Sequence, residues 1–257
     1  MRASLLLGTG LVAAASVGGG AWAAHRGDPA APLKEGATPV IVELFSSEGC
    51  SSCPPAEGYL AQLDRSQSVD GVTVLALEEH VDYWDHLGWA DPFAQGEFGE
   101  RQHRYASVLA DHGVYTPEIV IDGHALVEGG DEEQAARDMQ ASAREPRARV
   151  ALVLHGSVVD VDVTGVTAAA EGDGAEVWLA VTESGLESHV ESGENAGRRL
   201  THAPVVRALR RLGTVTGDAF RTQTVVDAAL AWKPRALRIV VFVQEATSRR
   251  IVGSAGV

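Results

Sequence analysis

The chain has 257 residues, of which 45% are hydrophobic, and its 35 acidic and 21 basic residues give a formal net charge of −14. This length allows one large domain or two of ordinary size, each with an apolar core. The excess of negative charge, without a dense basic run, argues against nucleic acid or anionic lipid as a partner.

The first 23 residues predict a bacterial export signal: a single Arg2, an apolar run over residues 4–17, and the small-residue pattern AWA ending at Ala23. An uncleaved anchor is the alternative, but the apolar run is shorter than the ~20 residues that span a bilayer. We expect a mature protein without a stable membrane span, located in the periplasm or secreted. Residues 24–37 are polar and lack an apolar period, which predicts a linker without fixed structure.

The two cysteines of the chain, Cys50 and Cys53, follow a predicted strand over residues 38–46. A β-branched apolar run indicates this strand, and apolar residues at i, i+4 and i+7 from Ala56 indicate a helix after the cysteines. Two prolines directly after Cys53 suit a first helical turn, where an N–H group has no intrahelical partner. The cysteines are therefore expected on a strand-to-helix turn.

Two cysteines three residues apart can form a redox dithiol, half of a metal site, or a structural clip. An exported protein stapled by disulfides usually has several bridges, and this pair closes too small a ring to remove much unfolded-state entropy. Cys50, at the outer edge of the turn, is expected at the positive end of the helix dipole, which can lower a thiol pKa from ~8.5 to roughly 3.5–7.5. Cys53, one turn into the helix, is expected to be the resolving thiol.

A second buried strand is predicted over residues 72–80, and a polar and aromatic segment follows it. Asp91 and Pro92 are typical of an N-cap and a first helical residue, so a helix is predicted from there to Gly113.

Two short apolar runs on either side of Asp122-Gly123 predict a β-hairpin, and Thr116-Pro117 comes directly before it. Residues 131–143 predict one more helix.

The segment after the second strand contains candidate site residues. In an open α/β sheet, ligands gather outside the carboxyl ends of strands, the same edge at which the cysteine turn emerges. His80 or Asp82 is therefore a candidate for proton transfer with the thiols. Tyr83, Trp84 and Trp89 are candidates for an apolar groove. The alternative is that these aromatic residues only plug and cap a long loop.

On the following helix, Arg101, Gln102 and Arg104 are more typical of a solvated face than of a site. His103 and His112 have no partner at a meaningful spacing and are expected at the surface.

From about residue 147 onward, apolar runs of strand length alternate with Gly and Asp turns. Strands are predicted at residues 148–156, 158–165, 176–184 and 237–246. Asp160 and Asp162 are expected on the solvent-exposed face of a half-buried strand and not in a calcium site. This part of the chain predicts a small, mainly antiparallel β-sandwich packed on the first domain.

Residues 193–202, GENAGRRLTH, precede a short helical pattern over residues 203–213. The polar side chains of this segment can reach over the cysteines or satisfy the domain interface, and we favour the interface. These side chains are Arg198, Arg199, Thr201 and His202.

The order strand, CxxC, helix, strand, helix, Thr-Pro, hairpin, helix resembles the thioredoxin fold. More narrowly, VELFSSEGCSSCPPAE, HVDYWDHLGWADPF, RQHRYA and VYTPEIVIDG, with GENAGRRLTHAPVVRAL further on, resemble exported bacterial thioredoxin-like proteins of domain-of-unknown-function family 1223 (DUF1223). The resemblance implies a thioredoxin-like α/β domain over residues 38–146, followed by the β-rich domain over residues 147–257. It also implies that Pro117 is cis and faces the CxxC pair, with Thr116 available to an extended peptide.

The leading functional hypothesis is a thiol–disulfide oxidoreductase without a bound cofactor, acting on protein or peptide thiols and disulfides together with a redox partner. Cys50 attacks and Cys53 resolves the mixed disulfide. The alternative is a Cu(I)-binding or copper-delivery protein that uses both thiolates and His80 or His86, since Cu(I) prefers soft ligands. A third hypothesis is a structural clip in a β-sandwich binding protein.

Overall fold

The computed structural model describes residues 30–109, 113–128, 130–167, 174–227, 229 and 232–257. In chain order its elements are β1 (Thr38–Ser46), α1 (Pro54–Ser66), β2 (Val72–His80), η1 (Asp82–Leu87), α2 (Gly96–Leu109), β3 (Glu118–Ile121), β4 (Ala125–Glu128), α3 (Glu132–Ser142), β5 (Arg149–His155), β6 (Val158–Thr164), β7 (Ala175–Glu183), β8 (Glu187–His189), β9 (Arg199–Thr201), β10 (Val205–Thr214), β11 (Ala219–Val225), η2 (Pro234–Ala236), β12 (Leu237–Glu245) and β13 (Ile251–Gly256).

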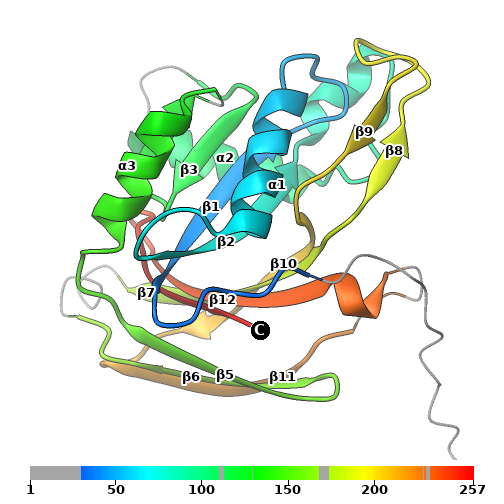
Figure 1. Ribbon diagram of the computed structural model, residues 1–257. Helices are drawn as coiled ribbons and strands as arrows, with labels where there is room; N and C mark the ends of the chain where they lie inside the picture. Colours follow the sequence, from blue (N-terminus) through cyan, green and yellow to red (C-terminus); the bar gives the residue numbers. More distant parts are fainter. Residues whose placement is uncertain (1–29, 110–112, 129, 168–173, 228, 230–231) are drawn as a thin grey trace, which may run out of the picture.

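Eight of these strands form one mixed sheet, in the order β13-β12-β7-β10-β2-β1-β3-β4. A three-stranded antiparallel sheet, β11-β6-β5, lies below it in the view of Figure 1, and the β8-β9 hairpin projects at the upper right. The fold is therefore mixed α/β, with one large mixed sheet and a smaller antiparallel one.

β1 and β2 lie at the centre of the large sheet and pair in parallel, so that their last residues, Ser46 and His80, lie opposite each other. Both strands are buried over nearly their whole length, which explains their long apolar runs. On one face they pack against α1 and α3 through Leu60 and Met139. On the other face they pack against α2 through Phe98. The predicted bounds of both strands are confirmed.

The predicted hairpin is confirmed as β3-β4, which extends the sheet from β1. Asp122 and Gly123 have φ angles of 42° and 67° in its turn. The predicted helix over residues 131–143 is confirmed as α3, and the side chain of Asp131 caps it by accepting a hydrogen bond from the Gln134 amide.

Helix α2 begins later than predicted. Asp91 is not its N-cap, because Asp91 Oδ1 accepts a hydrogen bond from the Phe93 amide 2.8 Å away in a separate turn, and the helix starts at Gly96. His112, expected at the surface, lies outside the described residues. His103 is exposed as expected.

The C-terminal strands continue the same sheet. β10 makes one parallel bridge to β2, from Val205 to Glu78, and pairs along its length with β7 in antiparallel orientation. The helical pattern predicted over residues 203–213 is therefore wrong. Pairing between two neighbouring strands overrides a weak local preference here, as it often does for strand residues.

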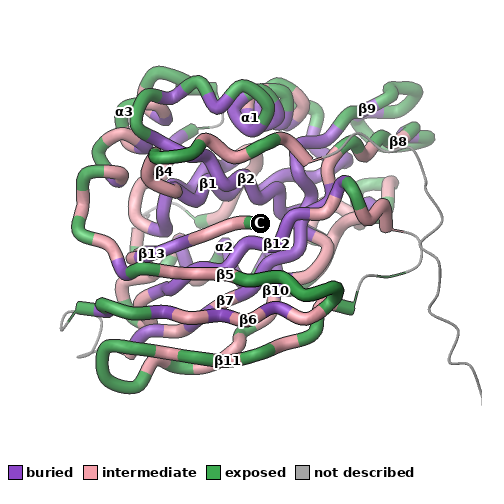
Figure 2. Tube along the Cα trace, turned by 60° about the horizontal axis from the view of Figure 1, so that its bottom comes forward, coloured by how far each residue is buried: buried purple, intermediate pink, exposed green. Residues whose placement is uncertain are grey.

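The four predicted C-terminal strands are confirmed as β5, β6, β7 and β12. Val159, Val161 and Val163 of β6 share a buried core with residues of β7 and β12, so the smaller sheet and the large sheet form a sandwich, and not the separate small sandwich that was expected beside the first domain. Asp160 and Asp162 lie on the opposite face of β6, half exposed, and accept hydrogen bonds from side chains of β11. Figure 2 shows the contrast between the buried central strands and the exposed stretches of β5 and β11.

One face of this sandwich belongs to the large sheet, so the sheet crosses the predicted boundary at residue 146. The division of the chain into two domains there stays a prediction.

The predicted linker is ordered from residue 30 onward. Arg238 donates a hydrogen bond to the Ala31 carbonyl, Thr73 Oγ1 donates to the Lys34 carbonyl, and Leu33 packs against the core. The absence of fixed structure expected for residues 30–37 is therefore wrong, because backbone carbonyls and one leucine supply contacts that an apolar period does not reveal. The predicted export signal lies outside the described residues.

Within the described ranges, no helix is both long enough and apolar enough to cross a membrane.

Candidate functional site

Cys50 and Cys53 form a disulfide on the turn between β1 and α1. The turn is held by hydrogen bonds from the Cys50 amide to the Ser47 carbonyl and from the Cys53 amide to the Cys50 carbonyl. Cys53 is the N-cap of α1 and so does not lie one turn inside the helix, because the helix begins only at Pro54. Neither cysteine has any exposed surface, so the expected outer-edge exposure of Cys50 is also wrong in this oxidised state.

The disulfide turn is covered by residues 192–195, which we call the strap. Asn195 is buried, and its Nδ2 group donates to the carbonyls of Glu48 and Cys50, both at 2.9 Å. The Glu194 carboxylate accepts from the amide and the hydroxyl of Ser51, at 3.2 and 2.7 Å. Glu194 and Asn195, which the sequence did not single out, therefore reach over the cysteines. Of the side chains that were considered for this role, Arg198 donates to Asn195 Oδ1, Arg199 pairs with Glu187, Thr201 is exposed, and His202 contacts Glu48 and Glu78.

The strap is also attached to the loop after η1. Ser192 Oγ donates to the Gly88 carbonyl at 2.5 Å, and a Cβ added to Gly193 would lie 3.2 Å from the Cβ of Trp89. The indole of Trp89 in turn donates to Glu48 Oε2 at 2.6 Å. The strap, the loop after η1 and the disulfide turn are thus linked to one another by direct contacts.

Two of the three predicted aromatic residues adjoin the cysteine turn. A Cβ at Gly49 would lie 3.2 Å from the Cβ of Trp84, and the Trp84 indole donates to Thr116 Oγ1 at 2.8 Å. The hydroxyl of Tyr83 donates to Gln102 Oε1 on α2 at 3.0 Å. Trp84 and Trp89 therefore adjoin the turn, whereas Tyr83 is directed towards α2.

The remaining predicted loop residues lie near the same edge of the sheet. Asp82 is exposed, and its carboxylate lies over the first turn of α2, where an added Cβ at Gly96 would come within 3.1 Å of it. The Thr116–Pro117 bond is cis, as the resemblance implies. Pro117 immediately precedes Glu118, which pairs with Phe45 near the end of β1 that leads into the cysteine turn.

His80 is buried at the end of β2 between two carboxylates. Its Nδ1 lies 2.7 Å from Asp91 Oδ2 and its Nε2 lies 2.9 Å from Glu78 Oε1. Burial lowers the pKa of His80, but Asp91 and Glu78 outweigh burial and raise it well above its usual value. Burial raises the carboxylate pKa values, but contact with the imidazoles holds the pKa of Glu78 and that of Asp91 below their usual range.

A second imidazole, that of His202, joins this group. Its Nε2 lies 3.2 Å from Glu48 Oε1 and its Nδ1 lies 3.4 Å from Glu78 Oε1. Burial opposes protonation of His202, but Glu48 and Glu78 raise its pKa to about 9. The ring centroids of His80 and His202 are 5.1 Å apart.

Glu57 completes the group from the first turn of α1. Its Oε1 accepts a hydrogen bond from Ser46 Oγ at 2.5 Å, and its Oε2 lies 3.8 Å from His202 Nδ1. Burial, together with the charge of Glu78, raises the pKa of Glu57 to about 7. The members of this acid–histidine cluster are Glu48, Glu57, Glu78, His80, Asp91 and His202.

The cluster contains atoms that can bind a metal ion: one donor each from Glu78, His80 and His202 lies within 4.8 Å of the others. The alternative Cu(I) set of Cys50, Cys53 and His80 stays a prediction, since the structure holds the oxidised pair. The two sulfurs are bonded to each other, and both nitrogens of His80 face carboxylates.

Two residues expected on a solvated face are buried instead. Arg101 Nε lies 2.6 Å from Glu43 Oε1, and Arg101 Nη2 lies 2.8 Å from the Tyr105 hydroxyl. Gln102 Nε2 donates to Glu118 at 2.8 Å. The expectation failed because acidic side chains on β1 and β3 reach α2, whereas Arg104, exposed at 41%, agrees with it.

The acidic members of the cluster and Asn195 were not among the predicted site residues. One signal was present: Glu43, Glu78 and Glu79 interrupt otherwise apolar strands, and all three are fully buried. A buried acid requires a partner, so such an interruption points to a polar group on the facing element. The identity of that group, 58 positions away for Glu43 and Arg101, is not visible in the local pattern.

Comparisons with known proteins agree with the fold and the motifs. A family model described as "Protein of unknown function (DUF1223)" matches residues 41–244. The crystal structure of protein AGR_C_4864 from Agrobacterium tumefaciens is 27% identical and superposes with a TM-score of 0.69, over 87% of this chain and 96% of that one. No curated protein matches the chain.

Proposed function

Because this chain belongs to the DUF1223 family, as its motifs implied, we propose a function from the chemistry of its site: an exported thiol–disulfide oxidoreductase acting on protein or peptide substrates. The observation that carries the proposal is the Cys50–Cys53 disulfide on the turn that leads into α1. Residues 1–23 support a periplasmic or secreted location by their sequence pattern.

The proposed reaction is a two-step exchange. A substrate thiolate attacks Cys50 Sγ, a mixed disulfide forms, and the electron pair of the broken S–S bond leaves with Cys53 as its thiolate. A second substrate thiolate then attacks the substrate sulfur of the mixed disulfide, which releases Cys50 as a thiolate and the substrate as a disulfide. The reverse sequence reduces a substrate disulfide. Cys50 is the proposed point of attack because the exposed Ser51 and Ser52 follow it, whereas α1 follows Cys53.

The arrangement of the surrounding elements supports the hypothesis of a thioredoxin-like fold. The cysteine turn joins β1 to α1, β2 returns parallel to β1, and β3 and β4 extend the sheet in antiparallel orientation. Pro117 lies before β3 at the end of the sheet from which the cysteine turn leaves. A peptide laid beside Thr116 would then add as a strand next to the disulfide.

The strap determines access to the disulfide. Both cysteines are covered, and Asn195 and Glu194 bind the turn directly. Exchange with a protein substrate therefore requires the strap to move away, and the hydrogen bonds of Asn195 are the contacts that resist this movement.

The proposal is tested by equilibrating the protein with mixtures of reduced and oxidised glutathione, trapping the thiols with an alkylating reagent and measuring masses. We expect one reversible two-electron transition. Cys53→Ser should accumulate a mixed disulfide at Cys50, and Cys50→Ser is the matched control. A disulfide that stays oxidised in excess reduced glutathione contradicts the proposal. A mixed disulfide that forms at Cys53 only contradicts the assignment of roles to the two cysteines.

A further inference from the structure

The acid–histidine cluster contains inward-facing donor atoms that the thiol chemistry does not use. Glu57 Oε2, Glu78 Oε2 and His202 Nδ1 are buried and have no hydrogen-bond partner. Leaving one such atom unsatisfied costs about 1–3 kcal/mol. Two of them, Glu57 Oε2 and His202 Nδ1, face each other only as an ion pair 3.8 Å apart, so a group bound between them would satisfy both.

The spacing of the donors matches one small ion. His80 Nε2 lies 2.9 Å and His202 Nδ1 lies 3.4 Å from Glu78 Oε1, and His202 Nδ1 lies 3.8 Å from Glu57 Oε2. Two ligands of a tetrahedral ion, each about 2.0–2.1 Å from it, are about 3.4 Å apart. These three separations lie on both sides of that value, and donors of Glu78, His80 and His202 all lie within 4.8 Å of one another, so Glu57 is the ligand that would have to move to complete the set.

In each imidazole, the nitrogen on the far side from the proposed ion already contacts a carboxylate. His80 Nδ1 lies 2.7 Å from Asp91 Oδ2, and the same oxygen accepts a hydrogen bond from the Glu48 amide at 2.8 Å. His202 Nε2 contacts Glu48 and the hydroxyl of Ser188. A carboxylate on the far nitrogen is the usual support of a metal-binding histidine, because it fixes the tautomer and directs the other nitrogen to the ion.

We propose that Glu57, Glu78, His80 and His202 bind one divalent first-row transition-metal ion. Imidazole nitrogens and carboxylate oxygens suit Zn²⁺ and its neighbours, and the buried carboxylates of the cluster attract a cation. The site uses neither cysteine, so it shares only His80 with the copper set considered above and does not depend on the proposed oxidoreductase activity.

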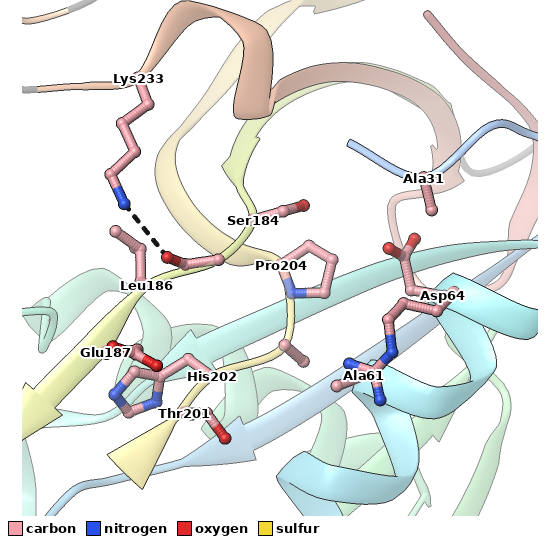
Figure 3. Close-up of a pocket in the computed structure, with 13 residues that line it drawn as sticks. Ala31, Ala61, Asp64, Ser184, Leu186, Glu187, Thr201, His202, Pro204 and Lys233 are labelled. Atoms are coloured by element: carbon pink, nitrogen blue, oxygen red, sulfur yellow. Dashed lines mark hydrogen bonds between the residues drawn. The ribbon is translucent and has the colours of Figure 1, made fainter. Parts of the chain in front are cut away.

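His202 also lines a surface pocket of about 470 Å³ between α1 and the segments on either side of β8 and β9. In Figure 3, His202 lies with Glu187 and Thr201 on one side of this pocket, and Asp64 of α1 lies on the other. His202 therefore stands between solvent and the buried donors, as an ion entering the cluster requires.

The ion would join three segments that are distant in the sequence: the first turn of α1, the end of β2, and the segment between β9 and β10 that follows the strap. An ion that binds only the folded protein raises the free energy of unfolding by RT ln(1 + [M]/Kd). Binding is therefore expected to raise the melting temperature of the full chain even when the disulfide is reduced.

The experiment uses the full chain, dialysed against a chelator and then titrated with Zn²⁺ by calorimetry, with the bound metal counted by mass spectrometry. We expect one ion per chain. His202→Gln should weaken binding by more than the 10–100-fold typical of a lost supporting carboxylate, and Asp91→Asn should weaken it by that 10–100-fold. His189→Gln, an exposed histidine on β8, is the matched control and should bind as the parent does.

Two further variants keep the test decisive. If His202→Gln does not fold, Glu57→Gln tests the site instead, because it changes a different proposed ligand. Circular dichroism checks that this variant is folded. Cys50→Ser/Cys53→Ser should bind Zn²⁺ as tightly as the parent chain. Absence of Zn²⁺ binding by the folded parent, binding unaffected by Glu57→Gln and His202→Gln, or binding lost with the cysteines would each overturn the proposal. None of these results depends on thiol exchange.

Discussion

Asn195 donates hydrogen bonds from one amide group to the carbonyls of Glu48 and Cys50, so a side chain 145 positions beyond Cys50 holds the disulfide turn closed. Both acceptors belong to the loop that carries the disulfide. The contacts that cover the cysteines therefore come in part from the C-terminal half of the chain.

Asn195→Ala should accelerate reduction of the disulfide by a small dithiol by about tenfold, the factor that corresponds to loss of roughly 1.4 kcal/mol from the closed state. The two carbonyls lose their donor and the strap opens more often. The rate is read from alkylation of the released thiols. Arg199→Ala, which removes the exposed ion pair with Glu187 in the same hairpin, is the control and should change the rate little. Equal rates for both variants would argue that the strap does not limit access.

Arg101→Ala should lower the free energy of unfolding by about 3–5 kcal/mol, because it leaves the buried Glu43 carboxylate without its cation. Arg104→Ala on the same helix removes a solvent-exposed pair with Glu100 and should cost less than about 1 kcal/mol. Urea unfolding of the two variants measures the difference. Similar losses would mean that Arg101 is not paired in the folded protein.

Gly123→Ala should be far more damaging than Gly71→Ala, although both residues have positive φ angles of 67° and 73°. At Gly71 an added Cβ meets nothing within 4 Å, so only the left-handed backbone penalty of about 1–2 kcal/mol applies. At Gly123 it would lie 2.0 Å from the Arg249 carbonyl oxygen, so the backbone must move. Melting temperatures of the pair test this, and an equal decrease would contradict the close approach of the two chain segments.

Alkaline pH should destabilise the protein through its tyrosines. Burial is the main cause that raises the pKa of all four from their usual 10.0, to about 12 for Tyr59. Above pH 10 the unfolded chain releases these protons and the folded chain does not, so the free energy of unfolding falls as the pH rises from 10 through the raised pKa values. Absorbance titration of tyrosinate in native and guanidinium-unfolded protein should give separate midpoints. Coincident midpoints would show that the rings are not protected.

The elements with strong local patterns could be predicted from the sequence. β1 and β2 are buried on both sides, so their apolar runs are nearly continuous, and α3 has a clear N-cap in Asp131. β10 could not be predicted, because its strand conformation depends on pairing with β2 and β7.

The candidate site could be predicted only in part. The cysteine turn is a local feature, and so is the position of His80 at the end of a strand. The partners of His80, by contrast, come from the facing side chain of Asp91 and from a glutamate inside an apolar strand. The cover provided by Asn195 and the second imidazole of His202 depend on how the distant C-terminal half folds back, which a local pattern does not encode.

The continuity of the large sheet through β10 limits how the chain can be divided. A fragment ending at residue 146 would keep the cysteines but would present the outer side of β2 as an uncovered edge, and such an edge pairs readily with other chains. The same fragment would lack the residues that close over the disulfide. Transplanting this cysteine turn into another protein, or expressing it alone, therefore requires the C-terminal half, which covers the edge of β2 and protects it from aggregation.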